Sequence, residues 1–197
     1  MSDYSILNII ENGISLLYTQ ISFPGARLVR LPVYIRGKKG ISYQKGLTTG
    51  HGCRIDVQAS QESLVIGKDA RIGDYVHINA DEKIIIGDNV LIASKVFISD
   101  ASHGIYKGDH QSSPYSNPSL RETVTDSVSI GNNVWIGENV VILAGSKIGN
   151  GCIIGANTLV NGGEYPDNTI IVGSPARIIK RYNEETQKWE KYRNVGD

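Results

Sequence analysis

The stretch that decides the fold is SIGNNVWIGENVVILAGSKIGNGCIIGANTLV, residues 129–160. In it an aliphatic residue recurs at every sixth position: Ile130, Ile136, Ile142, Ile148, Ile154 and Val160. A helix has no period of six, and a simple strand alternates with a period of two. A period of six fits a parallel β-solenoid, in which three short strands and three tight corners make one coil of about eighteen residues. The sequence therefore predicts an all-β solenoid.

The same spacing continues upstream, in the order Ile66, Ile72, Ile78 and then Ile86, Ile92, Ile98. Thr49 and Ile55, also six apart, indicate an earlier coil, so we expect about five coils in all. The first residue of each hexad points inward and stacks on its copy one coil away, which suits the stiff, β-branched isoleucine. Glycine (22 residues), Asn and Asp between these residues are expected to permit the unusual backbone angles of the corners.

The repeat is interrupted twice. Between Ile78 and Ile86 the step is eight, which two extra residues among 80–83 explain. Between Ile98 and Ile130 the step is thirty-two, which six does not divide. The sequence therefore predicts a polar loop, residues 99–127, extruded between coils, and long loops in compact folds usually carry function.

We expect three segments: an N-terminal segment 1–45, the solenoid 46–163 and a C-terminal capping extension 164–197. An amphipathic helix is predicted over residues 4–20, because Ile6, Ile10, Ile14, Leu17 and Ile21 recur at helical spacing. Residues 27–45 carry six basic side chains and no acidic one. The N-terminal segment is expected to pack on the solenoid, with its charges in solvent; the alternative is peripheral contact with anionic lipid.

Composition limits the functions further. Twenty basic and twenty acidic residues give no net charge, so there is no general argument for nucleic-acid binding. No apolar run approaches the ~20 residues that span a bilayer, and the first twenty residues do not match a signal peptide. Two cysteines, 99 positions apart, favour neither a disulfide framework nor a zinc knuckle. We therefore expect a cytoplasmic protein, with the inner face of the membrane as a possible location.

The hexads resemble those of the hexapeptide-repeat acyltransferases, the left-handed parallel β-helix family, most specifically in 129–160 and in IVGSPARIIKR, residues 171–181. Within that family, SDASHGIYKG (99–108) and VWIGENV (134–140) are most similar to bacterial O-acetyltransferases that act on sialic acids, O-antigens and capsular or exopolysaccharides. The resemblance implies a homotrimer that uses acetyl-CoA, needs no metal and has active sites between its subunits.

Transfer of acetyl from a thioester to a sugar hydroxyl needs a base, and a neutral imidazole is suited to that role near pH 7. Of the four histidines, His103 matches the catalytic loop histidine of the family and is our candidate general base. His51 and His77 are expected on coil surfaces or corners, and His110 in a solvated loop. In this hypothesis the acceptor attacks the thioester directly and no acetyl-enzyme forms.

The resemblance suggests three further residues around the reacting groups. Asn79 aligns loosely with an asparagine that positions the acceptor hydroxyl, although it could be a corner residue. Asp100 could hold the acceptor, orient His103 or cap the loop. Trp135 could donate its indole N–H to the acetyl oxygen, or only pack against the loop or a neighbouring subunit.

For CoA, the resemblance indicates the last coils. Ala156 matches a position whose backbone meets the pantetheine arm, and Arg177 and Lys180 match a basic pair near the CoA phosphates; a solvated capping strand is the alternative for that pair. A lysine that relatives often have before the proline is missing, so contacts there fall to Asn161 and the backbone of Gly162.

Three other functions compete with O-acetyl transfer to a glycan. The first is N-acetylation of an amino sugar or of a nucleotide-linked amino sugar. The second is a γ-class carbonic anhydrase, for which His77, His103 and His110 would have to bind zinc. The third is a scaffold protein with a vestigial site.

Overall fold

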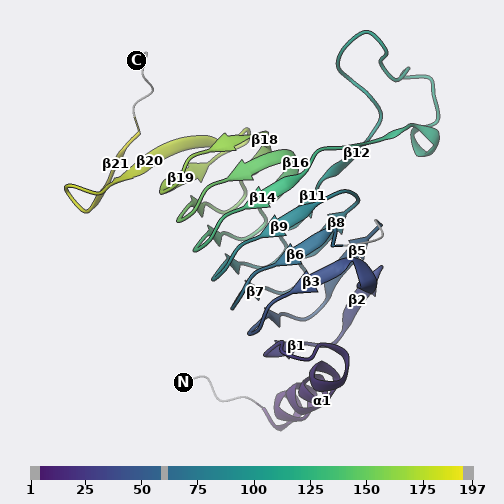
Figure 1. Ribbon diagram of the computed structural model, residues 1–197, viewed down its shortest axis with the longest axis vertical. Coiled ribbons are helices and arrows are strands. Elements are labelled where there is room, and N and C mark those ends of the chain that lie inside the picture. The colour runs from purple at the N-terminus through teal and green to yellow at the C-terminus, as the bar shows by residue number, and fades with distance from the viewer. Residues whose placement is uncertain (1–4, 59–61, 193–197) are drawn as a thin grey trace.

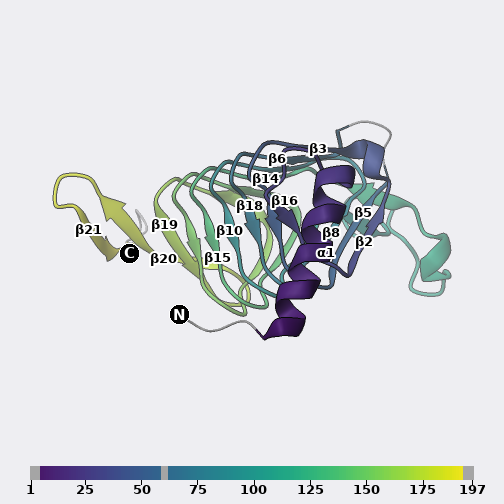
Figure 2. The same cartoon turned by 90° about the horizontal axis from the view of Figure 1, so that it is seen from below.

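The computed structural model describes residues 5–58 and 62–192, which form a parallel β-solenoid shaped as a three-sided prism, with a helix at its N-terminal end (Figures 1 and 2). Face A consists of β1 (Leu28–Val29), β4 (Thr48–Thr49), β7 (Arg71–Ile72), β10 (Leu91–Ile92), β15 (Trp135–Ile136), β17 (Ile153–Ile154) and β19 (Thr169–Val172). Face B consists of β2 (Val33–Arg36), β5 (Cys53–Val57), β8 (His77–Ala80), β11 (Phe97–Ser99) and the first halves of β16 (Val141–Ile148) and β18 (Leu159–Tyr165). Face C consists of β3 (Ile41–Tyr43), β6 (Leu64–Ile66), β9 (Ile84–Ile86), β14 (Val128–Ile130) and the second halves of β16 and β18.

The predicted stacking of the hexads is confirmed. Ile98 is paired in parallel with Ile78 on one side and Ile142 on the other, and all three side chains are fully buried. Each such isoleucine stabilises the fold by about 1.5–3 kcal/mol relative to an exposed one. The expected left-handed parallel β-helix is therefore the fold of the protein.

The number of coils was underestimated. The solenoid has about seven turns rather than five, because β1, β2 and β3 form a coil N-terminal to residue 46, and β19 begins another after residue 163. The expected boundaries at 45 and 163 thus fall inside the solenoid. The first coil is hard to find in the sequence because its inward residues are Val29, Ile35 and Tyr43, and eight residues rather than six separate Ile35 from Tyr43.

The role expected for the hexad glycines was partly wrong. The left-handed backbone conformation at the corners belongs largely to Asn and Asp, for example Asn133 (φ 57°) and Asn139 (φ 56°). The glycine after the inward isoleucine is needed for a different reason, since a Cβ on Gly131 would lie 2.7 Å from the backbone nitrogen of Asn150 in the next coil. These glycines therefore let successive coils approach closely.

Helix α1 (Ile6–Ser22) confirms the predicted helix but not the direction of its apolar stripe. Its two buried residues are Ser15 and Thr19, whose hydroxyls accept hydrogen bonds from the backbone N–H groups of Leu31 (3.1 Å) and Val29 (2.8 Å). The helix thus caps the open edge of the first coil with polar groups. The predicted stripe faces away from the solenoid, since its residues are between 52% and 83% exposed: Ile6, Ile10, Ile14, Leu17 and Ile21.

The predicted loop leaves the corner between faces B and C as a separate antiparallel hairpin (Figure 1). Its strands are β12 (Ala101–His103) and β13 (Thr123–Thr125), and the 3₁₀ helix η2 (Pro118–Leu120) lies between them. A second 3₁₀ helix, η1 (Lys38–Gly40), lies in the first coil. At the other end, β20 (Arg177–Asn183) and β21 (Lys188–Lys191) extend face A as antiparallel strands, and their hairpin projects beyond the coils (Figure 1).

Candidate active site

Two rows of outward side chains run along face B, because alternate residues of each strand point away from the core. The parallel register gives the first row as Tyr34, Arg54, His77, Phe97, Val141 and Leu159. The second row begins Arg36, Asp56, Asn79 and Ser99, and ends with Leu143 and Asn161. Face B therefore changes from a charged and polar surface in the first coils to a largely apolar one in the last.

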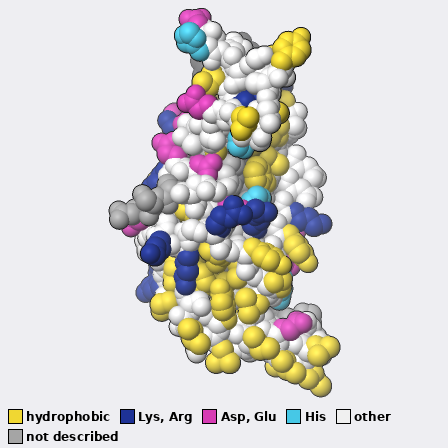
Figure 3. Space-filling view, turned by 90° about the vertical axis from the view of Figure 1, so that its right-hand side faces the viewer, with side chains coloured by type: hydrophobic (Ala, Val, Ile, Leu, Met, Phe, Trp, Pro, Cys, Tyr) yellow, Lys and Arg dark blue, Asp and Glu magenta, His cyan; other side chains and the backbone are white. Residues whose placement is uncertain are grey.

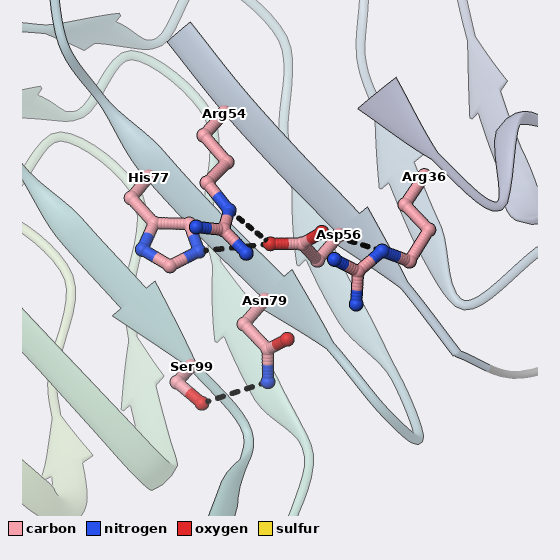
Figure 4. Close-up of polar contacts among 6 residues, drawn as sticks. All are labelled: Arg36, Arg54, Asp56, His77, Asn79 and Ser99. Carbon is pink, nitrogen blue, oxygen red and sulfur yellow. Dashed lines mark hydrogen bonds and ion pairs between the residues drawn. The ribbon is translucent and has the colours of Figure 1, made fainter. Parts of the chain in front are cut away.

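Asp56 is the centre of the polar end (Figure 4). Its side chain is only 8% exposed and contacts Arg54 Nε at 2.6 Å, Arg36 Nε at 3.4 Å and His77 Nε2 at 3.2 Å. Burial acts to raise the pKa of Asp56, but the hydrogen bonds from Arg54 and His77 and the charges of both arginines outweigh it, so this pKa is lowered. The carboxylate is thus ionised and holds three side chains in place. His77 also packs on Phe97, with ring centroids 5.2 Å apart.

The structure places Asn79 on β8, next to Asp56 and opposite Ser99, with 3.5 Å between its Nδ2 and the Ser99 hydroxyl oxygen. Asn79 is a half-buried strand residue rather than the corner residue that was the alternative.

Asp100 is fully buried, and its carboxylate accepts hydrogen bonds from three successive backbone N–H groups, those of Asp81 (2.8 Å), Glu82 (2.9 Å) and Lys83 (2.6 Å). Of the three roles considered for Asp100, these contacts fit a cap. It fixes the two-residue insertion of the preceding coil and the base of the extruded hairpin at the same time.

His103 is exposed, at the end of β12, where it is paired with Thr123 of β13. Its backbone oxygen accepts a hydrogen bond from the Tyr106 hydroxyl (2.7 Å). Asp81 lies at the base of the same hairpin, where its backbone N–H donates to the Asp100 carboxylate (2.8 Å). Burial and the Asp100 carboxylate raise the pKa of Asp81, and its buried Oδ1 has no hydrogen-bond partner among the described residues. His103, Asp81 and Asn79 thus share one corner of face B.

Trp135 lies elsewhere. It is on β15 of face A, 51% exposed, between Leu91 and Ile153 in the outward row of that face. The hairpin that carries His103 leaves the corner between the other two faces (Figure 2). One chain therefore does not bring Trp135 and His103 together.

The residues expected to bind CoA all lie in the last coils but not on one face, since Arg177 and Lys180 are on β20, which extends face A. Residues 155–159 stack on residues 171–176, since Gly155 N–H donates to Ile171 O (2.9 Å) and Leu159 N–H donates to Gly173 O (3.0 Å). This stacking places the exposed Ala156 and Arg177 in neighbouring coils, with Asn161 at the next corner. Gly162 takes a left-handed conformation, and its N–H donates to the Ser146 hydroxyl (3.1 Å). Lys180, also exposed, lies farther along β20, opposite Ile170.

The other histidines follow expectation. His51 lies at a corner, where its Nδ1 is 2.7 Å from Leu31 O; His77 is on a coil surface; and His110 is exposed in the loop. No group of three or more His, Cys, Asp or Glu side chains in residues 5–58 and 62–192 is arranged to hold a metal ion. In the same ranges no helix is long and apolar enough to cross a membrane.

Sequence reasoning missed the cluster around Asp56 and the position of Asp81. Twenty residues separate Arg36 from Asp56, and twenty-three separate Asp56 from Asn79. Neighbours on one face are one coil apart in sequence, so charged residues recurring at about that spacing were the signal available.

Comparison with known proteins supports an acyltransferase. A family model described as bacterial transferase hexapeptide (six repeats) matches residues 127–162. A protein of Escherichia coli K12 named as a lipopolysaccharide biosynthesis O-acetyl transferase, WbbJ, is 42% identical over 189 residues, which is 95% of either chain. The galactoside O-acetyltransferase of the same strain is 34% identical over 64% of this chain and 58% of its own.

Two solved structures are similar. A hexapeptide-repeat acetyltransferase of Vibrio cholerae, in complex with acetyl-CoA, has a TM-score of 0.57 and 28% identity over 81% of this chain and 69% of its own. An N-acyltransferase of Bacillus cereus, AntD, in complex with dTDP and 3-hydroxybutyryl-CoA, has a TM-score of 0.66 over 93% and 91% of the two chains. At 21% identity, this second likeness concerns the fold alone.

Proposed function

The chain belongs to the bacterial hexapeptide-repeat transferases and is an acetyltransferase that uses acetyl-CoA, and from this premise we propose that it acetylates a hydroxyl of a bacterial surface glycan. A relative named for lipopolysaccharide biosynthesis, similar over almost the whole chain, supports this class of acceptor. The observation that carries the proposal is the order of groups along the solenoid. The corner with His103, Asp81 and Asn79 lies in the middle coils, and the segment that resembles a CoA site lies in the last coils.

In the proposed reaction, His103 takes the proton of the acceptor hydroxyl while the oxygen of that hydroxyl attacks the thioester carbonyl carbon. The carbon–sulfur bond then breaks, and the imidazolium returns its proton to the CoA thiolate. Asn79 would orient the acceptor hydroxyl. Ala156, Asn161, Gly162, Arg177 and Lys180 would hold CoA. No side-chain nucleophile takes part, so no acetyl-enzyme accumulates.

Trp135 enters this scheme only if the site is shared between subunits, because it lies on a different face of the chain from the His103 hairpin. We therefore include a homotrimer in the proposal, with His103 from one subunit and Trp135 from the next. Exposed apolar side chains on both sides support this contact: Tyr115 (97%) and Leu120 (83%) in the extruded loop, and Leu91 (47%) beside Trp135 on face A.

The test of the catalytic role is His103→Ala. Removal of a general base costs about 10²–10⁴-fold in turnover. His110→Ala is the matched control, because it removes an exposed histidine of the same loop. Near-normal turnover by His103→Ala would contradict the mechanism, and a large loss in His77→Ala alone would move the base to His77.

The alternative acceptor is an amine of an amino sugar. The product distinguishes the two, because an O-acetyl ester is cleaved by mild alkali and an N-acetyl amide is not. Acetyl-CoA consumption with a panel of glycans, followed by mass spectrometry before and after alkali treatment, gives the answer. An alkali-stable product would favour N-acetylation.

The helix also supports a peripheral membrane contact. In Figure 3, hydrophobic side chains gather at the end of the molecule where α1 lies, and Lys and Arg side chains lie above them. The outward stripe of α1 would enter the lipid, and the basic residues of the first coil would meet anionic headgroups. We expect co-sedimentation with vesicles containing phosphatidylglycerol, reduced in Leu17→Glu and unchanged in Ile85→Glu, which changes an exposed residue of face C. If Leu17→Glu instead changes the oligomeric state, the stripe is a subunit contact.

A further inference from the structure

Arg36 and Arg54 form a fork of two guanidinium groups above one buried carboxylate (Figure 4). Both arginines contact Asp56 through Nε, and their side chains are 66% and 53% exposed. The terminal nitrogens of the two guanidinium groups have no hydrogen-bond or ion-pair partner among the described residues. The two guanidinium groups and the one carboxylate together carry one net positive charge.

One guanidinium charge is enough to balance the buried Asp56 carboxylate, and both arginine side chains are largely in solvent. Asp56, by contrast, is nearly buried, and it restricts both long side chains to one orientation. A guanidinium held in this way presents parallel N–H donors that match a carboxylate or phosphate, with less entropy to lose on binding.

The fork borders a hollow of about 710 Å³ on face B, which is also lined by Tyr34 and Gly52. That volume suits a sugar or a small charged group. Tyr34, 63% exposed, offers a ring against which an apolar sugar face can stack.

The hollow lies on the same face as the proposed reacting groups. Asp56 is paired with Asn79, and Asn79 with Ser99, on successive strands. Strands are ~4.8 Å apart, so about 15 Å separates the strand of Arg36 from that of Ser99. An acceptor with its hydroxyl beside Asn79 and His103 would reach the arginines with a group about one or two sugar units away.

We propose that Arg36 and Arg54 form a subsite for an acidic group, a phosphate or a carboxylate, carried by the acceptor near the acetylated sugar. This inference rests on the proposed function, because it takes face B as the surface that holds the acceptor. It assigns the enzyme to negatively charged glycans rather than neutral ones.

The test is direct binding to the full chain without acetyl-CoA, measured by NMR titration or calorimetry with three probes that share one ring. Glucose 1-phosphate carries a phosphate, glucuronate carries a carboxylate and methyl glucoside is neutral. We expect at least one of the acidic probes to bind more tightly than methyl glucoside, and the preference between the two identifies the acidic group. Affinity should fall as salt is raised.

Arg36→Gln/Arg54→Gln should lower the affinity for the acidic probe at least tenfold and leave the affinity for methyl glucoside unchanged. Arg27→Gln/Lys45→Gln, which changes the net charge equally at exposed positions away from the hollow, should alter binding less than twofold. Arg36→Lys/Arg54→Lys keeps the charge but loses the fork, so its affinity for the acidic probe should lie between those of the two other double variants. Unfolding temperatures show whether each variant is folded.

The proposal is overturned if neither acidic probe binds more tightly than methyl glucoside, or if the glutamine pair binds like the wild type. His103→Ala should keep the wild-type affinity for the acidic probes, because the subsite does not use it. In the wild type, a preference for the acidic probes without acetyl transfer to any glycan would count against the proposed function. Acetyl transfer without a preference for the acidic probes would count against the subsite.

Discussion

Asp81 and Asp100 are neighbours, but their surroundings differ. Asp100 is buried with both oxygens bonded to backbone N–H groups, whereas the buried Oδ1 of Asp81 accepts no hydrogen bond from the described residues. Burial and the charge of Asp100 raise the pKa of Asp81 above its ordinary value of 3.8. The Asp81 carboxylate is therefore a cost to the fold at this corner, of a kind that is often kept where function needs it.

Asp81→Asn should therefore stabilise the protein in a pH-dependent way. Because the pKa of Asp81 is higher in the folded chain, its favourable contribution is present below pH 3.8 and is lost as the pH rises through the folded pKa. The variant should exceed the wild type in free energy of unfolding at pH 7, with the difference shrinking toward pH 4, as measured by urea unfolding. A difference that grows on acidification would contradict this assignment.

Cys53 gives a second prediction at this scale. The pKa of its thiol is raised to about 11. Burial is the largest cause, and the charge of Asp74 makes a smaller contribution. About one molecule in a thousand would then carry the thiolate at pH 8, and the thiolate is the reactive form. We expect Ellman's reagent to label neither Cys53 nor the buried Cys152 in the native protein at pH 8, and both after unfolding. Rapid native labelling would show that the coil opens.

At the scale of the element, the hexad glycines test how the coils stack. Gly131→Ala should destabilise the protein by about 1–3 kcal/mol, because the new Cβ would lie 2.7 Å from the next coil. Gly13→Ala in α1 is the matched control. Its Cβ meets nothing within 4 Å, and alanine is the better helix former, so a gain of about 0.5–1 kcal/mol is expected. The thermal unfolding temperature should therefore fall in Gly131→Ala and rise in Gly13→Ala.

Much of the fold could be predicted from the spacing of the inward residues along the sequence. The coils with Ile at inward positions follow from the spacing of six residues. The loop 99–127 follows from the interruption of that spacing between Ile98 and Ile130. The first coil was missed because Val29 and Tyr43 occupy inward positions where isoleucine is common in later coils, and because eight residues rather than six separate Ile35 from Tyr43. The orientation of α1 could not be inferred either, since a hydrophobic stripe identifies one face of a helix but not what that face meets.

The candidate site was predictable only in part for the same reason. His103, Asn79 and Asp100 lie at or beside the interruptions of the repeat, where the pattern itself draws attention. Asp56 and its arginines lie within regular strands, one coil apart, and become neighbours only through the register of the sheet. Their grouping depends on coil lengths of 20 and 23 residues, which the inward pattern alone did not establish for the first coils.

At the scale of the whole molecule, the placement of His103 and Trp135 makes a prediction about assembly. His103→Ala and Trp135→Ala should each be nearly inactive alone, since removal of a general base or of an oxyanion donor costs about 10²-fold or more. If each site takes His103 from one subunit and Trp135 from the next, co-expressed variants assemble some intact sites.

In a closed trimer mixed at random in equal amounts, the donor of His103 is intact in half of the subunits and the donor of Trp135 in the other half. About a quarter of the sites then contain both side chains, so the mixed protein should recover about a quarter of the wild-type activity. Size-exclusion chromatography with light scattering would show that the mixed protein is a trimer. If both residues acted within one chain, every site would lack one of them, and co-expression would recover no activity at all.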